Sequence, residues 1–187
     1  MTHVSDELAA EARQVMRTAD CIHTAEAVDE ALAAMAQAVS QDLSQANPVV
    51  LCVMTGGLFA TAGLLTHLDF PLELDYLHAT RYAGNTTGAG LSWHAKPKTA
   101  IKGRHVLIVD DILDEGITLA ALRDWSTEQG AVSVRTAILC EKRHDRNALG
   151  IKADYLGLTV PDRYVFGAGM DYRGYLRNVR GIYALAE

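Results

Sequence analysis

Hydrophobic positions along the chain repeat with two periods, and each period predicts one kind of element. Residues 24–45 carry apolar side chains at spacings of three and four, which predicts a helix with one buried face. Residues 58–68 and 117–130 also fit helices, and Gly130 is suited to end the second of these. The apolar stripe of the first helix consists of Val28, Leu32, Met35, Val39 and Leu43.

Short apolar runs lie between these helical segments and predict strands. They occupy residues 48–57, which end in a Gly-Gly turn, and residues 71–82, 104–111 and 131–140. Strands that alternate with helices indicate an α/β fold with a mainly parallel central sheet flanked by helices. Residues 83–99 are polar and rich in glycine and show no hydrophobic period, which predicts a long loop of functional importance.

The C-terminal part of the chain has a different pattern. From about residue 153 onward the expected strands are short and turns are frequent. The length of 187 residues suits one domain with a sizeable core. We therefore expect residues 1–187 to form a single domain. The N-terminal segment and the region after about residue 153 would build a small hood over the sheet edge.

Composition narrows the classes of function. The formal net charge of −6 argues against nucleic-acid binding as the main function, because such binding requires clustered positive charge. No apolar stretch is long enough to span a membrane, and the N-terminus lacks the features of a signal peptide. Cys21, Cys52 and Cys140 are odd in number and lack C-x-x-C spacing, so neither a disulfide framework nor a zinc site is indicated. We expect a cytoplasmic protein without a membrane partner.

The sequence VLIVDDILDEGIT, residues 106–118, places four carboxylates directly behind a buried strand. Ligands of open α/β sheets bind at the carboxyl ends of strands, and a helix N-terminus holds phosphate through its free amides. Acids suit the hydroxyls of a ribose, so the segment could bind a ribose phosphate. Two other interpretations stay open here: solvated acids that cap a helix, and an acidic pocket for a metal or a phosphoaspartate. The common glycine-rich nucleotide motifs are absent from the sequence.

This segment resembles the 5-phosphoribosyl-1-pyrophosphate (PRPP) binding motif of type I phosphoribosyltransferases. That motif consists of an apolar strand, two acids, two apolar residues, then Asp-Thr-Gly and a Thr. Glu115 stands where the family usually has Thr. The resemblance implies the type I phosphoribosyltransferase fold and a PRPP site for ribose and phosphate. The implied site residues are Asp110, Asp111, Asp114, Glu115, Gly116, Ile117 and Thr118.

Over roughly residues 48–185 the chain resembles hypoxanthine-guanine phosphoribosyltransferases. VVLCVMTGG resembles their pyrophosphate loop, with backbone amides of Thr55 and Gly56 as donors, although many members have Lys in place of Thr55. RYAGNTTGAG, which begins with Arg81 and Tyr82, resembles the mobile loop that closes over the active site.

Two further segments match the family at its base-binding side. In CEKRHDRN, Lys142 corresponds to the lysine that reads the purine 6-oxo group. In PDRYVFGAGMDYRGYLR, Tyr164 corresponds to the aromatic that stacks on the base, and the backbone of Val165 to a contact with the base edge. Asp171 matches a magnesium-associated acid near the base, and Arg177 a pyrophosphate-binding arginine.

The resemblance implies a purine salvage enzyme that converts hypoxanthine or guanine and PRPP to IMP or GMP and pyrophosphate. It implies Mg²⁺ as cofactor, with Asp110, Asp111 and Asp171 as metal-associated acids, and Asp114 as proton acceptor at purine N7. It also implies a homodimer or homotetramer. One alternative is a preference for xanthine. Another is an RNA-binding regulator that senses PRPP or nucleotides, for which four arginines provide a local basic cluster. These are Arg163, Arg173, Arg177 and Arg180.

Overall fold

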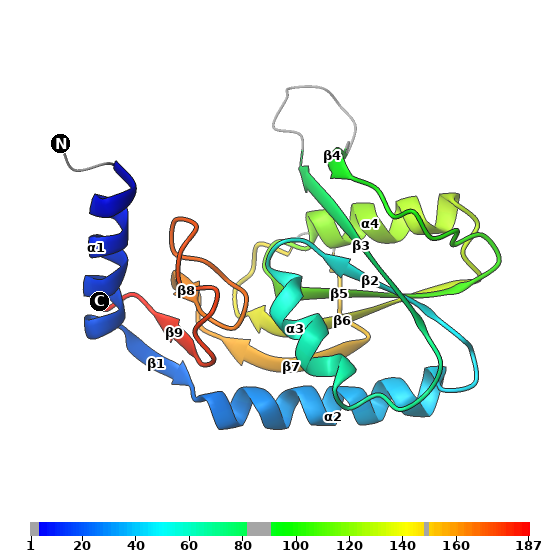
Figure 1. Ribbon diagram of the computed structural model, residues 1–187, viewed down its shortest axis with the longest axis horizontal. Coiled ribbons are helices and arrows are strands. Elements are labelled where there is room, and N and C mark those ends of the chain that lie inside the picture. Colours follow the sequence, from blue (N-terminus) through cyan, green and yellow to red (C-terminus); the bar gives the residue numbers. More distant parts are fainter. Residues whose placement is uncertain (1–3, 82–90, 148–149) are drawn as a thin grey trace.

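The computed structural model describes residues 4–81, 91–147 and 150–187, and its main layer in this part of the chain is a six-stranded sheet (Figure 1). The strand order is β4-β3-β2-β5-β6-β7, with β4 as the antiparallel edge strand and the other neighbours parallel. The prediction of a mainly parallel sheet is thereby confirmed. The strands are β2 (Val49–Val53), β3 (Glu73–Arg81), β4 (Leu91–Ala95), β5 (His105–Leu113), β6 (Ser133–Lys142) and β7 (Tyr155–Val160).

Helices cover both faces of this sheet, as the alternation of the sequence predicts. α2 (Ala25–Leu43) and α3 (Gly57–Leu65) pack on one face, and α4 (Ile117–Glu128) packs on the other. Successive side chains of β2 point to opposite faces of the sheet. Val50 packs in the core beneath α2 and α3, and Leu51 packs in the core beneath α4. This is why the central strands are apolar at nearly every position rather than at every second one.

The N-terminus of α2 is set by Thr24, whose hydroxyl accepts a hydrogen bond from the Ala27 amide at 3.3 Å. This bond satisfies one of the amides that a helix start leaves without a partner inside the helix. The apolar stripe predicted for this helix is buried along its whole length.

The prediction of one loop over residues 83–99 is wrong for residues 91–95. Residues 91–95 form β4, which pairs antiparallel with β3. Trp93 of this strand packs against Trp125 of α4, with ring centroids 4.8 Å apart. Leu91, Trp93 and Ala95 alternate with the polar Ser92 and His94, which is the pattern of a strand, but the run is only five residues long and follows a glycine-rich stretch. Tyr82 and the rest of the predicted mobile loop up to residue 90 lie outside the described residues, and Arg81 is the last residue of β3.

A second, smaller sheet unites the two ends of the chain. Its order is β1-β9-β8, and both pairings are antiparallel. Residues 155–160 do not belong to it, because they form β7 of the main sheet, so the predicted boundary near residue 153 is too early. The small sheet consists of β1 (Asp20–His23), β8 (Val165–Phe166) and β9 (Ile182–Ala184).

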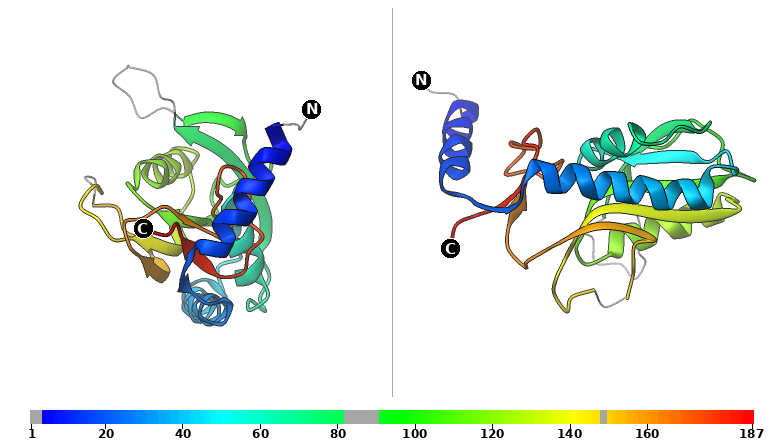
Figure 2. Two further views of the ribbon diagram at one scale, coloured as in Figure 1. Left: turned by 90° about the vertical axis from the view of Figure 1, so that its left-hand side faces the viewer. Right: turned by 90° about the horizontal axis from the view of Figure 1, so that it is seen from below.

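α1 (Val4–Thr18) precedes the small sheet and stands beside it, away from the main sheet (Figures 1 and 2). None of the helices in the described part of the chain combines the length and the apolar character that crossing a membrane requires.

Candidate active site

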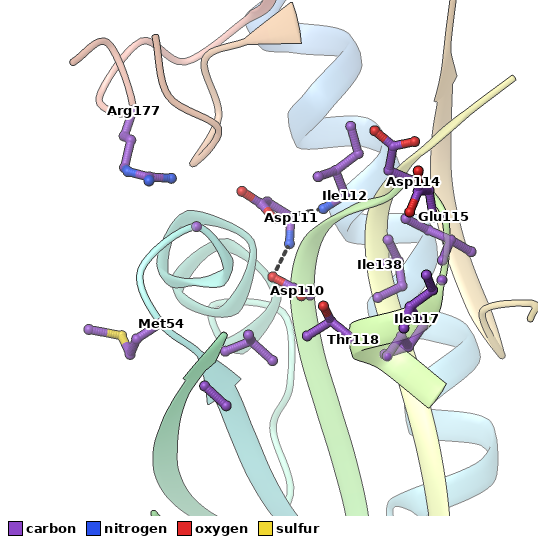
Figure 3. Close-up of a pocket in the computed structure, with 16 residues that line it drawn as sticks. Met54, Asp110, Asp111, Ile112, Asp114, Glu115, Ile117, Thr118, Ile138 and Arg177 are labelled. Atoms are coloured by element: carbon purple, nitrogen blue, oxygen red, sulfur yellow. Dashed lines mark hydrogen bonds between the residues drawn. The ribbon is translucent and has the colours of Figure 1, made fainter. Parts of the chain in front are cut away.

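A cavity of about 440 Å³ lies where β2 and β5 end and α4 begins (Figure 3). Arg177 reaches it from the segment between β8 and β9. The seven residues that the sequence assigns to PRPP all line this cavity, and so does Gly56. They are Asp110, Asp111, Asp114, Glu115, Gly116, Ile117 and Thr118.

Asp110 and Asp111 form a close acidic pair at the end of β5. Asp110 Oδ1 accepts the Asp111 amide at 2.9 Å, and Asp111 Oδ1 accepts the Ile112 amide at 2.8 Å. Burial, together with the neighbouring Asp111 carboxylate, raises the pKa of Asp110 well above its ordinary value. Burial also raises the pKa of Asp111, although the positive charge of Arg177 acts in the opposite direction. The pair therefore favours a cation or a set of hydroxyl donors next to it.

The loop between β2 and α3 approaches β5 so closely that only glycine fits. A Cβ atom on Gly56 would lie 1.9 Å from Asp111 Oδ2, and one on Gly57 would lie 2.6 Å from the Val109 carbonyl oxygen. The exposed Thr55 does not line the cavity, whereas Met54 and Gly56 on either side of it do. Of the three residues predicted to bind pyrophosphate, the structure thus brings Gly56 and Arg177 to the cavity and leaves Thr55 beside it.

The start of α4 provides a place for an anion. Gly116 precedes the helix with φ +79°, and no side chain caps this helix start in the structure. The residues that open the helix, Ile117 and Thr118, line the cavity. Helix N-termini attract phosphate because their first amides point outward and the helix dipole is positive there. The positive φ favours glycine at 116, and a Cβ atom there would also lie only 3.0 Å from the Ile151 side chain.

Asp114 lies at the centre of a cluster of basic side chains. Lys142 Nζ donates to its Oδ2 at 2.9 Å, and His144 Nε2 lies 2.5 Å from its Oδ1. Arg146 is 3.6 Å from the same Oδ1. Burial opposes ionisation of Asp114, but the hydrogen bonds from Lys142 and His144 outweigh it and hold the pKa of Asp114 below its ordinary value. Asp114 is therefore a carboxylate at neutral pH.

His144 is a site residue that the sequence did not reveal. Its side chain is 4% exposed, and its Nδ1 accepts the Arg146 amide at 2.9 Å. Because Nδ1 is an acceptor, the proton of the neutral ring sits on Nε2 and is donated to Asp114. Arg146 is held in turn by Asp162 through two contacts of 2.6 Å. A single histidine after a strand carries no motif, so only the folded loop could identify it.

A second cavity of about 210 Å³ adjoins the first and shares Asp111, Ile112 and Asp114 with it. All four residues predicted to bind the purine line this smaller cavity together with Met170. They are Lys142, Tyr164, Val165 and Asp171. Tyr164 is 48% exposed, so its ring offers an aromatic surface, and its hydroxyl donates to the Asp171 carbonyl oxygen at 3.2 Å.

Asp171 and Arg177 are partners in the structure. Arg177 Nη2 lies 2.6 Å from Asp171 Oδ1, and Arg177 Nη1 donates to the Gly169 carbonyl oxygen at 2.7 Å. The other carboxylate oxygen of Asp171 accepts the Gly174 amide at 2.6 Å. Within the described ranges no group of three or more His, Cys, Asp or Glu side chains is arranged to hold a metal ion. The predicted metal role of Asp171 stays a prediction.

Comparison with known proteins decides the family. The chain matches the phosphoribosyl transferase domain family over residues 18–173. The chain belongs to the phosphoribosyltransferase family. The family indicated by the sequence resemblance and the predicted α/β fold class are both confirmed.

Several relatives of this phosphoribosyltransferase carry a purine in their names. A hypoxanthine-guanine-xanthine phosphoribosyltransferase of Tritrichomonas foetus is 39% identical over 141 residues, or 75% of this chain and 77% of that protein. A hypoxanthine-guanine phosphoribosyltransferase of Streptococcus pneumoniae is 36% identical over 161 residues, or 86% of this chain and 89% of that protein. A solved hypoxanthine-guanine-xanthine phosphoribosyltransferase superposes with a TM-score of 0.82 at 32% identity, covering 90% of this chain and 97% of that one.

Proposed function

We propose that this phosphoribosyltransferase transfers the 5-phosphoribosyl group of PRPP to hypoxanthine or guanine, forming IMP or GMP and pyrophosphate. The observation that carries the proposal is the pair of adjacent cavities with a common wall of Asp111, Ile112 and Asp114. One cavity has the helix start and acids that a ribose phosphate needs, and the other has an aromatic ring and a lysine. The names of the relatives support the purine as acceptor.

In the larger cavity, the amides at the start of α4 would hold the 5-phosphate, with the Thr118 hydroxyl as a further donor. Asp110 and Asp111 would accept hydrogen bonds from the ribose hydroxyls. The Gly56 amide and Arg177 would hold the pyrophosphate as its bond to C1′ breaks. Fixed donors that face the developing charge of a leaving group stabilise the transition state without reorganisation.

In the smaller cavity, Tyr164 would stack on the purine, the Val165 backbone would contact its edge, and Lys142 would donate to the 6-oxo oxygen. A lysine that reads this oxygen must turn from Asp114 toward the base or share its three N–H donors between them. Either arrangement links recognition of the base to Asp114. The purine loses one proton as its N9 bonds to C1′, and Asp114 is our candidate acceptor of the N7 proton.

Mg²⁺ fits the acidic pair. The carboxylates of Asp110 and Asp111 are hard oxygen donors, and burial of two adjacent acids leaves a negative site that a cation would stabilise. Mg²⁺ commonly uses one or two carboxylates, water and substrate phosphates, so a cluster of three protein ligands is not required. When bound, the ion would neutralise charge on the pyrophosphate as a Lewis acid. Asp171 is paired with Arg177 and accepts the Gly174 amide, and its role toward the ion stays a prediction.

The proposal also includes the location of the protein in the cell and its oligomeric state. The three cysteines are free thiols in the structure, which supports a cytoplasmic location. A homodimer or homotetramer is the expected assembly. The xanthine-using alternative is kept because the name of one relative includes xanthine, whereas no observation favours an RNA-binding regulator.

The test is an assay of the purified chain with PRPP, Mg²⁺ and one base at a time, with nucleotide and pyrophosphate both quantified. Hypoxanthine and guanine should each give one nucleotide per pyrophosphate, and adenine serves as the control base because it lacks the 6-oxo group. Turnover of xanthine alone would replace the proposal by the xanthine-using alternative. Absence of turnover with all three oxopurines would overturn it.

A further inference from the structure

Helix α1 lies outside the family match, which begins at residue 18 where the helix ends. It stands beside the small sheet and apart from the main core (Figures 1 and 2). Among its side chains Ala12 is buried, while most of the polar positions are exposed. A helix with so little burial is stabilised mainly by the contacts it makes at its ends and on one face.

Those contacts converge on the segment that follows Asp171. Glu11 accepts a hydrogen bond from the Tyr172 hydroxyl at 2.6 Å, and Arg173 Nη1 lies 3.0 and 2.9 Å from its two carboxylate oxygens. The Tyr175 hydroxyl donates to the Ser5 carbonyl oxygen at 3.1 Å. The hydrogen bond from Tyr172 holds the pKa of Glu11 below its ordinary value, so Glu11 is ionised at neutral pH.

The segment held in this way directly follows Asp171, which lines the smaller cavity. The backbones of Tyr172 and Tyr175 bond to each other in both directions at 2.8 Å, which closes a tight hairpin. The ring of Tyr172 meets Tyr164 edge to face with centroids 5.8 Å apart. Asp171, the residue before Tyr172, lines the smaller cavity and accepts the Tyr164 hydroxyl at its carbonyl oxygen.

We propose that Glu11 is a positioning residue for the base site: it holds Tyr172, whose ring meets the ring of Tyr164 edge to face, and so fixes the orientation of Tyr164. The inference rests on the proposed function for the identity of the ligand. Glu11 touches neither cavity, so its loss should weaken purine binding without slowing the chemistry. Arg177 has its own partners in Asp171 and Gly169, so PRPP binding should change less.

The kinetic test compares Glu11→Ala with Glu7→Ala, an exposed glutamate one turn earlier on the same helix. Because the Glu11 contacts are partly exposed, we expect the KM of the purine to rise by about threefold to tenfold. The kcat and the KM of PRPP should stay within about twofold of wild type. Tyr172→Phe should reproduce part of the effect, and the double variant should be no worse than Glu11→Ala, since both remove the same bond. Equal purine KM values for Glu11→Ala and Glu7→Ala would overturn the proposal, as would a fall confined to kcat.

A second measurement does not depend on turnover. Hydrogen exchange of the Tyr172 and Tyr175 amides in the ligand-free chain should accelerate in Glu11→Ala and not in Glu7→Ala. Unchanged exchange would show that α1 does not hold the segment. Faster exchange with an unchanged purine KM would reject the link to the base. If wild type turned over no purine, the proposed function would fail, while the exchange result would still decide whether α1 holds the hairpin.

Discussion

Replacing Asp114 by Asn separates the charge of this side chain from its shape. The carboxylate accepts from Lys142 on one oxygen and from His144 on the other. Lys142 has only donors, and His144 presents its Nε2–H because its Nδ1 accepts the Arg146 amide. An Asn side chain must therefore turn its NH₂ toward one of two donors, so one hydrogen bond becomes a repulsive contact.

The size of the effect follows from this geometry. A hydrogen bond to a charged group contributes about 1.5–3 kcal/mol, so the loss would release Lys142 or His144 from its position. General base assistance is worth about 10²–10⁴-fold in rate. The lowered pKa of Asp114 makes it a weaker base, which favours the lower end of that range. We expect kcat to fall by about 10²-fold and the Kd of PRPP to stay nearly unchanged.

Single-turnover rates with hypoxanthine and with guanine are the proper assay, because slow product release would mask part of the loss. Asp124→Asn, which removes an exposed carboxylate of α4, is the matched control. Wild-type single-turnover rates in Asp114→Asn would refute the role as proton acceptor. A PRPP affinity that falls in parallel with the rate would instead show that Asp114 acts in binding.

The pH dependence of the free enzyme provides an independent check on the same residue. The ionised form of Asp114 is present above its pKa and is lost as the pH falls through that value. Because its pKa lies below the ordinary aspartate range of about 3.9, the contribution of Asp114 to kcat/KM should be constant from about pH 5 to 8. A step in that range that is present in wild type and absent in Asp114→Asn would contradict this assignment.

Three further substitutions test other parts of the site and the core. Lys142→Ala should raise the KM of the purine by about 10-fold or more, because one charge-assisted hydrogen bond is lost, and should raise the KM of PRPP less. Steady-state kinetics with each substrate varied in turn would measure both values. Gly56→Ala would place a methyl group 1.9 Å from Asp111 Oδ2 and should abolish PRPP binding measured by calorimetry, even where circular dichroism reports a folded chain. Asp154→Ala removes the acceptor of both the amide and the hydroxyl of the buried Thr136 and should lower the free energy of unfolding in urea by about 1–3 kcal/mol. An unchanged urea midpoint would argue against that bond.

The sequence predicts those parts of the fold that depend on short-range pattern. The apolar runs at 49–53 and 106–109 are buried on both faces of a parallel sheet, so they needed no knowledge of partners to be recognised as strands. β4 was missed because its alternation of apolar and polar residues spans only residues 91–95 and directly follows a glycine-rich stretch. Pairing with β3 and the contact of Trp93 with Trp125 stabilise this short strand in the fold.

The residues of the candidate site also fall into those that the sequence predicts and those that only the folded chain reveals. The acids of residues 110–118 lie in one continuous motif, and all of the assigned residues line one cavity. His144 comes to Asp114 from 30 residues away, because the loop after β6 is folded back and fixed by the Arg146–Asp162 pair. The partnership of Asp171 with Arg177 likewise arises from a turn, which residue type alone does not specify.

The common wall of the two cavities has a practical consequence for ligand design. The compartments meet at Asp111, Ile112 and Asp114, so a sugar phosphate and a flat heterocycle would lie end to end with little space between them. One molecule that joins an anionic ribose mimic to a purine-like ring would fill both compartments. Once one half is bound, the other half is held at a high effective concentration beside its own site. The arrangement that brings two substrates into contact is thus a template for a bisubstrate inhibitor, which would bind more tightly than either half alone.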